Sequence, residues 1–292
     1  MAITISNVYV QTFENNVRHL AQQSMARLRG CVQERSVSSE KHNWETMGEN
    51  TAHLKAGTRN PTPEDDSEWG RRTSIADTYD IGDTSEQEDP VQMLVDPNSN
   101  ISRSIGMAMR RQIDDVIIAA ATGDSLDGAG TPIVFDDANQ LVGDGTVPFT
   151  FDGVTEVYEK FMEADIDPDV RKFMVIGPKQ LRKLQQLTEY TSSDYANVKA
   201  LASSGFVKAW MGFDWIVSTR LLDPSVAQDD SERSCLAFTD RAIGVQMNRD
   251  ITTRVAEDPS TSFLWRIYAY MTLGAVRVED EQLVHYRVAN TL

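Results

Sequence analysis

The stretch "DPNSNISRSIGMAMRRQIDDVIIAAATGD", residues 96–124, is the clearest element of this sequence. It opens with a run of helix-capping residues and closes at Gly123, a typical helix stop. Apolar side chains recur at spacings of three and four, which predicts one helix from about residue 99 to residue 122. At 1.5 Å per residue, the part from Ile101 onward is about 33 Å long. The apolar stripe that we expect to form its core includes Ile105, Met109, Ile113 and Ile117.

Residues 31–90 differ in character, because charged and turn residues dominate and apolar residues are too sparse for a core. Between Thr73 and Ile81 the side chains alternate with a period of two, which is typical of a strand with one wetter face. Two extended arms joined through Asn60-Pro61-Thr62-Pro63 would form a long projecting hairpin. A hairpin alone is marginal in water, so it needs a surface to lie against. We therefore expect this loop to be functional.

The N-terminal residues 12–29 have the spacing of an amphipathic helix, with Gly30 as its stop. Two interpretations stay open. The helix packs on its own domain, or it is a terminal arm that packs on a neighbouring subunit. Its apolar stripe consists of Phe13, Val17, Leu20, Ser24 and Leu28.

The second half of the chain mixes helices and strands. Asp152 is a candidate helix cap, and a strand at residues 173–176 meets Gly177-Pro178 and passes into a helix. Proline is a good first residue for that helix. Another strand is expected at residues 213–217, and the chain from Cys235 onward is strand-rich. This pattern predicts an α+β fold without clean βαβ repetition.

The composition is that of a folded protein, with 40% hydrophobic and 25% charged residues among 292. A formal net charge of −16 argues against a protein that grips nucleic acid, because such surfaces neutralise phosphates with Lys and Arg. No apolar run approaches the length of a membrane span. The opening residues lack a secretory leader pattern, so we expect a protein that is not secreted. Cys31 and Cys235 are expected to be reduced thiols.

The sequence offers no constellation of catalytic, cofactor-binding or metal-binding residues. Gly177-Pro178 is not a phosphate loop, because GxxxxGK[ST] is missing and proline removes an amide donor. The glycine-rich stretch "GDSLDGAGTP", residues 123–132, follows a helix and is expected to be a flexible connection. The four histidines show no metal-ligand spacing. We predict no catalytic, cofactor or metal residue.

In its order of elements the chain resembles the major capsid proteins of tailed bacteriophages, which have the Hong Kong 97 fold. A terminal arm, a long extended loop and a long "spine" helix come first, followed by the glycine-rich connection. The segments that carry the second half of the resemblance are "MVIGPKQLRKLQQL", "GFDWIVSTRL" and the strand-rich end from "DRAIGVQM" to "QLVHYRV".

This resemblance implies a shell subunit that is not an enzyme and needs no cofactor. Its subunits would form the pentamers and hexamers of an icosahedral virion capsid around double-stranded DNA, assembled in the host cytoplasm. Implied partners are a separate scaffolding protein, a portal protein and a cement protein. The implied parts are an N-terminal arm (1–30), an extended loop or E-loop (31–90), a peripheral domain with the spine helix (91–135 and 240–292) and an axial domain (136–239).

The same resemblance places the extended loop across a neighbouring subunit. Arginines there can pair with a neighbour's carboxylates, and a tryptophan can bury its ring against it. From the N-terminal arm, we expect contacts through Phe13, Val17 and Leu20. From the loop, the expected contact residues are Glu64, Asp65, Asp66, Glu68, Trp69, Arg71 and Arg72.

Two other functions remain as alternatives. A cellular encapsulin-like compartment would have the same fold and a different cargo. A cytosolic α/β enzyme would need a pocket that uses Asp124, Asp127 or Asp136 around the glycine-rich loop.

Overall fold

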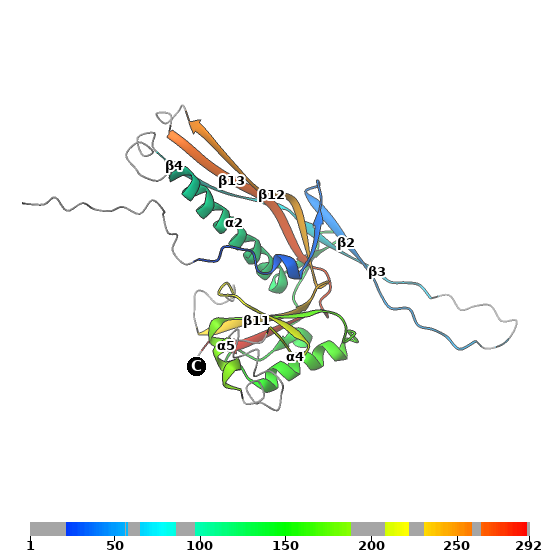
Figure 1. Cartoon of the computed structure of the whole chain (residues 1–292). Helices are drawn as coiled ribbons and strands as arrows, with labels where there is room; N and C mark the ends of the chain where they lie inside the picture. The colour runs from blue at the N-terminus through cyan, green and yellow to red at the C-terminus, as the bar shows by residue number, and fades with distance from the viewer. Residues whose placement is uncertain are drawn as a thin grey trace, which may run out of the picture. The chain divides into compact units, whose positions relative to one another are not determined.

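The computed structural model describes residues 22–55, 57, 65–85, 97–187, 208–221, 231–258 and 264–290. Its strands form three sheets beside a few helices, so the predicted α+β class is confirmed (Figure 1). The long helix, α2 (Pro97–Thr122), ends at the predicted residue. Residue contacts divide the chain into two compact units. The smaller unit holds residues 1–25, 79–111 and 251–271, and the larger unit holds 26–78, 112–250 and 272–292.

A six-stranded sheet is the centre of the larger unit. All five residues of β8 are buried, and the helices α4 (Phe151–Glu163) and α5 (Pro178–Gln186) contribute Val157, Phe161 and Leu184 to the same apolar core. Pro178 is the first residue of α5, as predicted. The strand order is β7 (Leu141–Val142), β14 (Leu283–Ala289), β11 (Glu232–Thr239), β8 (Lys172–Ile176), β10 (Phe213–Val217), β9 (Ala209–Trp210).

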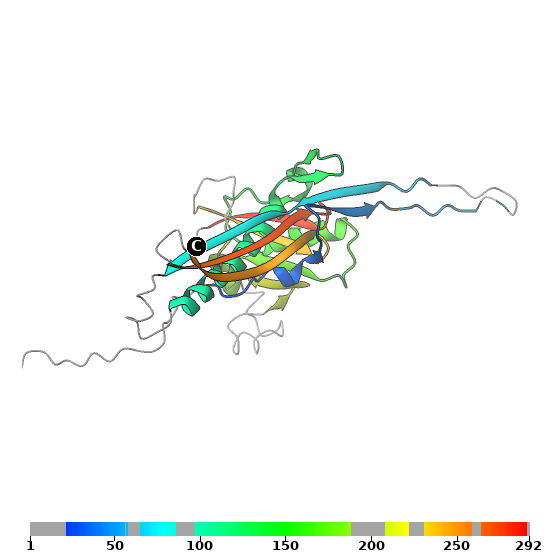
Figure 2. The same cartoon turned by 90° about the horizontal axis from the view of Figure 1, so that it is seen from above.

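A hairpin leaves the larger unit as a two-stranded arm (Figures 1 and 2). Its strands are β2 (Lys41–Met47) and β3 (Trp69–Ile75), which pair antiparallel from Lys41 opposite Ile75 to Met47 opposite Trp69. The predicted hairpin is therefore present, and its turn at residues 60–63 lies outside the described residues. Two short strands, β5 (Ser125–Asp127) and β6 (Pro132–Ile133), extend its sheet.

Four elements belong partly to each unit: α2, β4 (Asp77–Ser85), β12 (Ile243–Asp258) and β13 (Leu264–Arg277). The strands form a sheet of order β1-β12-β13-β4, in which β1 (Gln33–Ser36) is parallel to β12. Ile105 and Met109 of α2 are buried within the smaller unit. Ile113 and Ile117 are buried within the larger one. The bounds of the two units differ from the domain bounds expected above, and the peripheral and axial domains stay a prediction.

The predicted N-terminal helix over residues 12–29 is wrong in its described part. Residues 22–28 are not helical, and only a 3-10 turn, η1 (Arg29–Cys31), follows them. The reason is a tertiary contact. The N–H groups of Arg27 and Leu28 donate to the Asp114 carboxylate at 3.0 and 3.1 Å, instead of to carbonyls within a helix.

The start of α4 also differs from the prediction, because Thr150 rather than Asp152 is its cap. The Thr150 hydroxyl accepts the N–H of Gly153 at 3.1 Å. Asp152 lies in the first turn, where a negative charge interacts favourably with the helix dipole.

The single strand expected between Thr73 and Ile81 is two strands that separate at Ala76. β3 belongs to the hairpin, whereas β4 belongs to the sheet of β13. β13 passes this bend at Gly274, where a Cβ atom would lie 2.0 Å from the carbonyl oxygen of Ile75. Only glycine therefore fits at this crossing.

We expect Gly274→Ala to lower the free energy of unfolding by about 2 kcal/mol or more, because an added methyl group must push backbone apart. Urea unfolding of the subunit measures this. Gly106→Ala is the matched control, since Gly106 lies in α2 and, apart from the backbone of its own helix, no atom lies within 4 Å of the added Cβ. Alanine should leave stability unchanged there or raise it by up to about 1 kcal/mol. Equal effects at the two positions would contradict the tight crossing.

Candidate inter-subunit surfaces and the anchor of the hairpin

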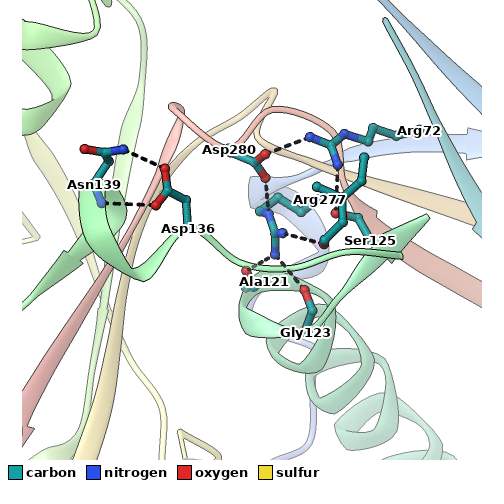
Figure 3. A network of polar contacts seen from close by, with 9 residues as sticks. Arg72, Ala121, Gly123, Ser125, Asp136, Asn139, Arg277 and Asp280 are labelled. Atoms are coloured by element: carbon teal, nitrogen blue, oxygen red, sulfur yellow. Dashed lines mark hydrogen bonds and ion pairs between the residues drawn. The ribbon is translucent and has the colours of Figure 1, made fainter. Parts of the chain in front are cut away.

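Arg277 ends β13 and holds the C-terminal end of α2. Its side chain is fully buried and donates to the carbonyl oxygens of Ala121 at 3.2 Å and Gly123 at 2.7 Å (Figure 3). The last carbonyls of a helix have no partner within the helix, and they carry partial negative charge. A guanidinium has five N–H donors and a positive charge, so it can pair with these carbonyls and balance their partial negative charge. It also lies over the Phe135 ring, 5.0 Å from the ring centre.

Asp280 joins this helix end to the hairpin. Its carboxylate accepts from the Nε of Arg277, and from Arg72 of β3 at 2.7 Å (Figure 3). Arg72 also donates to the Ser125 hydroxyl at 3.3 Å. The Arg72 side chain is only 15% exposed. A charge in such a place is tolerable when it is paired and hydrogen-bonded. Strand β3 is therefore fixed to the end of α2 through one carboxylate.

Trp44 fixes the other strand of the hairpin. It is buried on β2, and its indole N–H donates to the Ser74 hydroxyl at 3.1 Å. The ring packs with Val276 and Val278. Gly244 makes room for it, because a Cβ there would lie 2.6 Å from the indole. Both strands of the hairpin are thus held at its base.

Residues 22–28, within the predicted N-terminal arm, are bound to α2. In the larger unit, Asp114 is fully buried and accepts from the backbone of residues 27 and 28. In the smaller unit, Arg110 donates to the Ser24 carbonyl at 2.9 Å, and Arg111 donates to the Gln22 side chain at 2.8 Å. The predicted arm contacts Phe13, Val17 and Leu20 lie outside the described residues.

Trp69 on the hairpin is 68% exposed, as its predicted contact with a neighbour requires. It lies directly opposite Met47, which is 55% exposed. Together they form an apolar pair on the hairpin surface, which we call the Met47–Trp69 pair. Sequence reasoning missed Met47, although the register of a long hairpin would have placed it there.

The charged residues predicted on the loop have different environments. Arg71 pairs with Glu45 at 2.5 Å on the surface, and Asp65 pairs with His53 at 2.9 Å. Arg72 is different, because its guanidinium is already used within the subunit. Asp66 and Glu68 are exposed, and Glu64 lies outside the described residues.

Two of the three acids of the alternative enzyme pocket, Asp127 and Asp136, have structural roles. Asp127 accepts amide N–H groups from the turn that follows it, chiefly that of Thr131, and these bonds lower its pKa. Asp136 caps α3 (Asp137–Gln140), and its hydrogen bond from Asn139 lowers its pKa (Figure 3).

In the described ranges, no His, Cys, Asp and Glu side chains gather as metal ligands. Burial raises the pKa of the Cys235 thiol to about 12, so this thiol is protonated at neutral pH. Nor is any described helix long and apolar enough to span a membrane.

Comparison with known proteins agrees over nearly the whole chain. A family model described as "Phage capsid protein" matches residues 5–289. The capsid of Ralstonia phage GP4 superposes with a TM-score of 0.75 at 9% identity, over 100% of this chain and 98% of that one. The capsid of cyanophage P-SCSP1u gives 0.73 at 16%, over 97% and 94%. A chain of Mycobacterium phage Che8 gives 0.71 at 16%, over 96% and 97%. Comparison with curated proteins gives no sequence match.

These structural similarities confirm the predicted Hong Kong 97 fold. Because these structures are at most 16% identical to the chain, they are evidence for its fold alone. The family match indicates what kind of protein it is.

Replacing Arg277 with Met should lower the free energy of unfolding by about 3–5 kcal/mol, because it removes one partner of a buried, hydrogen-bonded charge. Arg71→Met is the matched control, since Arg71 pairs with Glu45 on the surface and should contribute under about 1 kcal/mol. Denaturant unfolding of both variants decides the matter. Similar small losses would show that Arg277 is not what fixes the end of α2.

Proposed function

This chain belongs to the phage capsid protein family, and from that premise we propose that it forms the pentamers and hexamers of an icosahedral shell around a double-stranded DNA genome. It is a structural protein of a phage capsid. We assign it no catalytic role. The observation that carries the proposal is the hairpin, which is fixed at its base and exposes the apolar side chains of Met47, Leu54 and Trp69.

The exposed hairpin favours assembly because it leaves apolar area uncovered in a single subunit. The Met47–Trp69 pair faces solvent, and Leu54 farther along is 97% exposed. Apolar area of this kind gains free energy when a partner covers it. A neighbouring subunit is the partner that repeats at every position of a shell.

The contacts proposed for the hairpin are those of Glu64, Asp65, Asp66, Glu68, Trp69 and Arg71, with Arg72 acting mainly as an anchor within the subunit. For the N-terminal arm they are Phe13, Val17 and Leu20. The parts proposed from the resemblance are the arm (1–30), the extended loop (31–90), the peripheral domain (91–135 and 240–292) and the axial domain (136–239).

The charge of the chain fits a container for DNA. With a net charge of −16, the subunit has no general attraction for phosphates, so a genome can be enclosed without being held. The proposed partners are a separate scaffolding protein, a portal protein and a cement protein. Assembly in the host cytoplasm is part of the same proposal.

Trp69→Ser should leave the isolated subunit folded, because the side chain is exposed, and should weaken shell formation. Val134→Ser is the matched control, since Val134 is also 68% exposed but does not lie on the hairpin. Circular dichroism reports the fold, and light scattering with electron microscopy reports the shells. If the Trp69 variant assembles at the same concentration as the Val134 variant, the hairpin does not make the proposed contact.

A further inference from the structure

The outward face of α5 is basic. Lys179, Arg182 and Lys183 are three and four residues apart, so they lie on one side of the helix. Gln180 and Leu184 on the opposite side are buried. Lys179 and Arg182 are exposed, Lys183 is half-buried, and α5 contains no Asp or Glu. In a chain with 44 acidic and 28 basic residues, such a surface is a local exception.

An acidic groove lies at the base of the hairpin in the same unit. Its volume is about 1030 Å³, and it is lined by eight carboxylates and three arginines. Two of these arginines already have partners, since Arg71 pairs with Glu45 and Arg72 pairs with Asp280. The groove is bounded by the hairpin base, the loop after α4 and the turn between β13 and β14.

Four carboxylates leave this groove strongly negative. They are exposed, and none of them forms an ion pair within the part of the chain that the structure describes. The neighbouring Glu279 has a raised pKa, chiefly through burial and further through the charge of Glu281. A cationic surface placed here would meet several carboxylates at once. The four are Glu163, Asp165, Asp167 and Glu281.

The two surfaces lie on different sides of the larger unit. In Figure 1, α5 lies at the left of the six-stranded sheet, whereas the hairpin, whose base lines the groove, projects to the right. Copies of one chain that join head to tail use two different surfaces, and the contact repeats around a closed ring. Two grooves facing each other would repel, so the charges favour this head-to-tail arrangement over a symmetric pair.

We propose that the basic face of α5 in one copy of this chain docks on the acidic groove of the next copy. Long, flexible Lys and Arg side chains suit an open groove, and complementary charge would select the orientation of the encounter. The inference rests on the proposed function, because a shell supplies the repeated neighbour. Nucleic acid phosphate is the other chemistry that fits α5, but the groove gives the basic face a complement on the chain itself.

Charge reversal on each surface, alone and together, tests the proposal. The α5 reversal is Arg182→Glu with Lys183→Glu, and the groove reversal is Glu163→Lys with Glu281→Lys. Each alone should raise the protein concentration needed for assembly by roughly tenfold or more, because like charges then face each other. A chain that carries both reversals should assemble at close to the wild-type concentration. An equimolar mixture of the two single reversals should form six-membered rings, since alternating copies restore both contacts there, but not five-membered rings, in which two copies of one variant must meet.

The control for net charge is Arg35→Glu with Arg103→Glu, which changes two exposed arginines that belong to neither surface. It should assemble like the wild type, and each variant must keep the wild-type circular dichroism spectrum. The inference is overturned if the α5 reversal assembles normally, or if the combined reversal does not restore assembly. It is also overturned if the α5 reversal abolishes binding of a short DNA duplex and leaves assembly unchanged. A wild-type chain that forms no shells would instead overturn the proposed function.

Discussion

A buried guanidinium must have partners, and much of this subunit is arranged around one. Arg277 is the last residue of β13, and it donates to the carbonyl of Ala121 in the last turn of α2 and to that of Gly123 just after the helix. Asp280 neutralises it from the turn that follows, and the same carboxylate holds Arg72 of the hairpin. Without this arrangement, the end of α2, the turn after β13 and the hairpin would each need other interactions to hold them in place. One set of charges brings together segments far apart in the sequence.

The hairpin shows how alternate residues of a strand separate two roles. Trp44 faces inward on β2 and is buried against Val276 and Val278, whereas Met47, three residues later, faces outward. Successive side chains of a strand point to opposite faces, so one strand can be bound to the subunit and remain available for contact. The fixed part and the exposed part of the arm are therefore encoded within a few residues.

Local sequence patterns predict part of this fold. The rest depends on contacts with residues far away in the sequence. The length of α2 follows from its apolar spacing, and the start of α5 follows from Gly177-Pro178, because both depend on near neighbours. The pairing of Arg72 with Asp280 joins residues 208 positions apart, so no local pattern contains it. The same limit explains the N-terminal error. A helical spacing was present, but the acceptor that decides the conformation of residues 27 and 28 belongs to Asp114.

The candidate surfaces also differ in whether the sequence alone suggests them. Trp69 stands out in the sequence because a large aromatic side chain sits in a polar loop. Its partner Met47 becomes visible only through the register of β2 and β3. The groove was beyond sequence reasoning, because its carboxylates come from the hairpin, β5, the end of α4 with the loop after it, and the turn before β14. Acidic residues scattered along the chain look like ordinary solvated charge until the fold places them around one hollow.

The hairpin is fixed through both of its strands, so it projects from the larger unit in a single direction. That direction is set when the subunit folds. A freely hinged arm would have to lose its rotational freedom each time it met a partner, and that loss weakens binding. Trp44 and Arg72 remove the freedom beforehand. In a shell built through this arm, the angle between adjacent copies is then a property of the folded chain. The curvature of the particle, and with it its diameter, would then depend on the packing of Trp44 beside Gly244 and on the Asp280 carboxylate that Arg72 and Arg277 share.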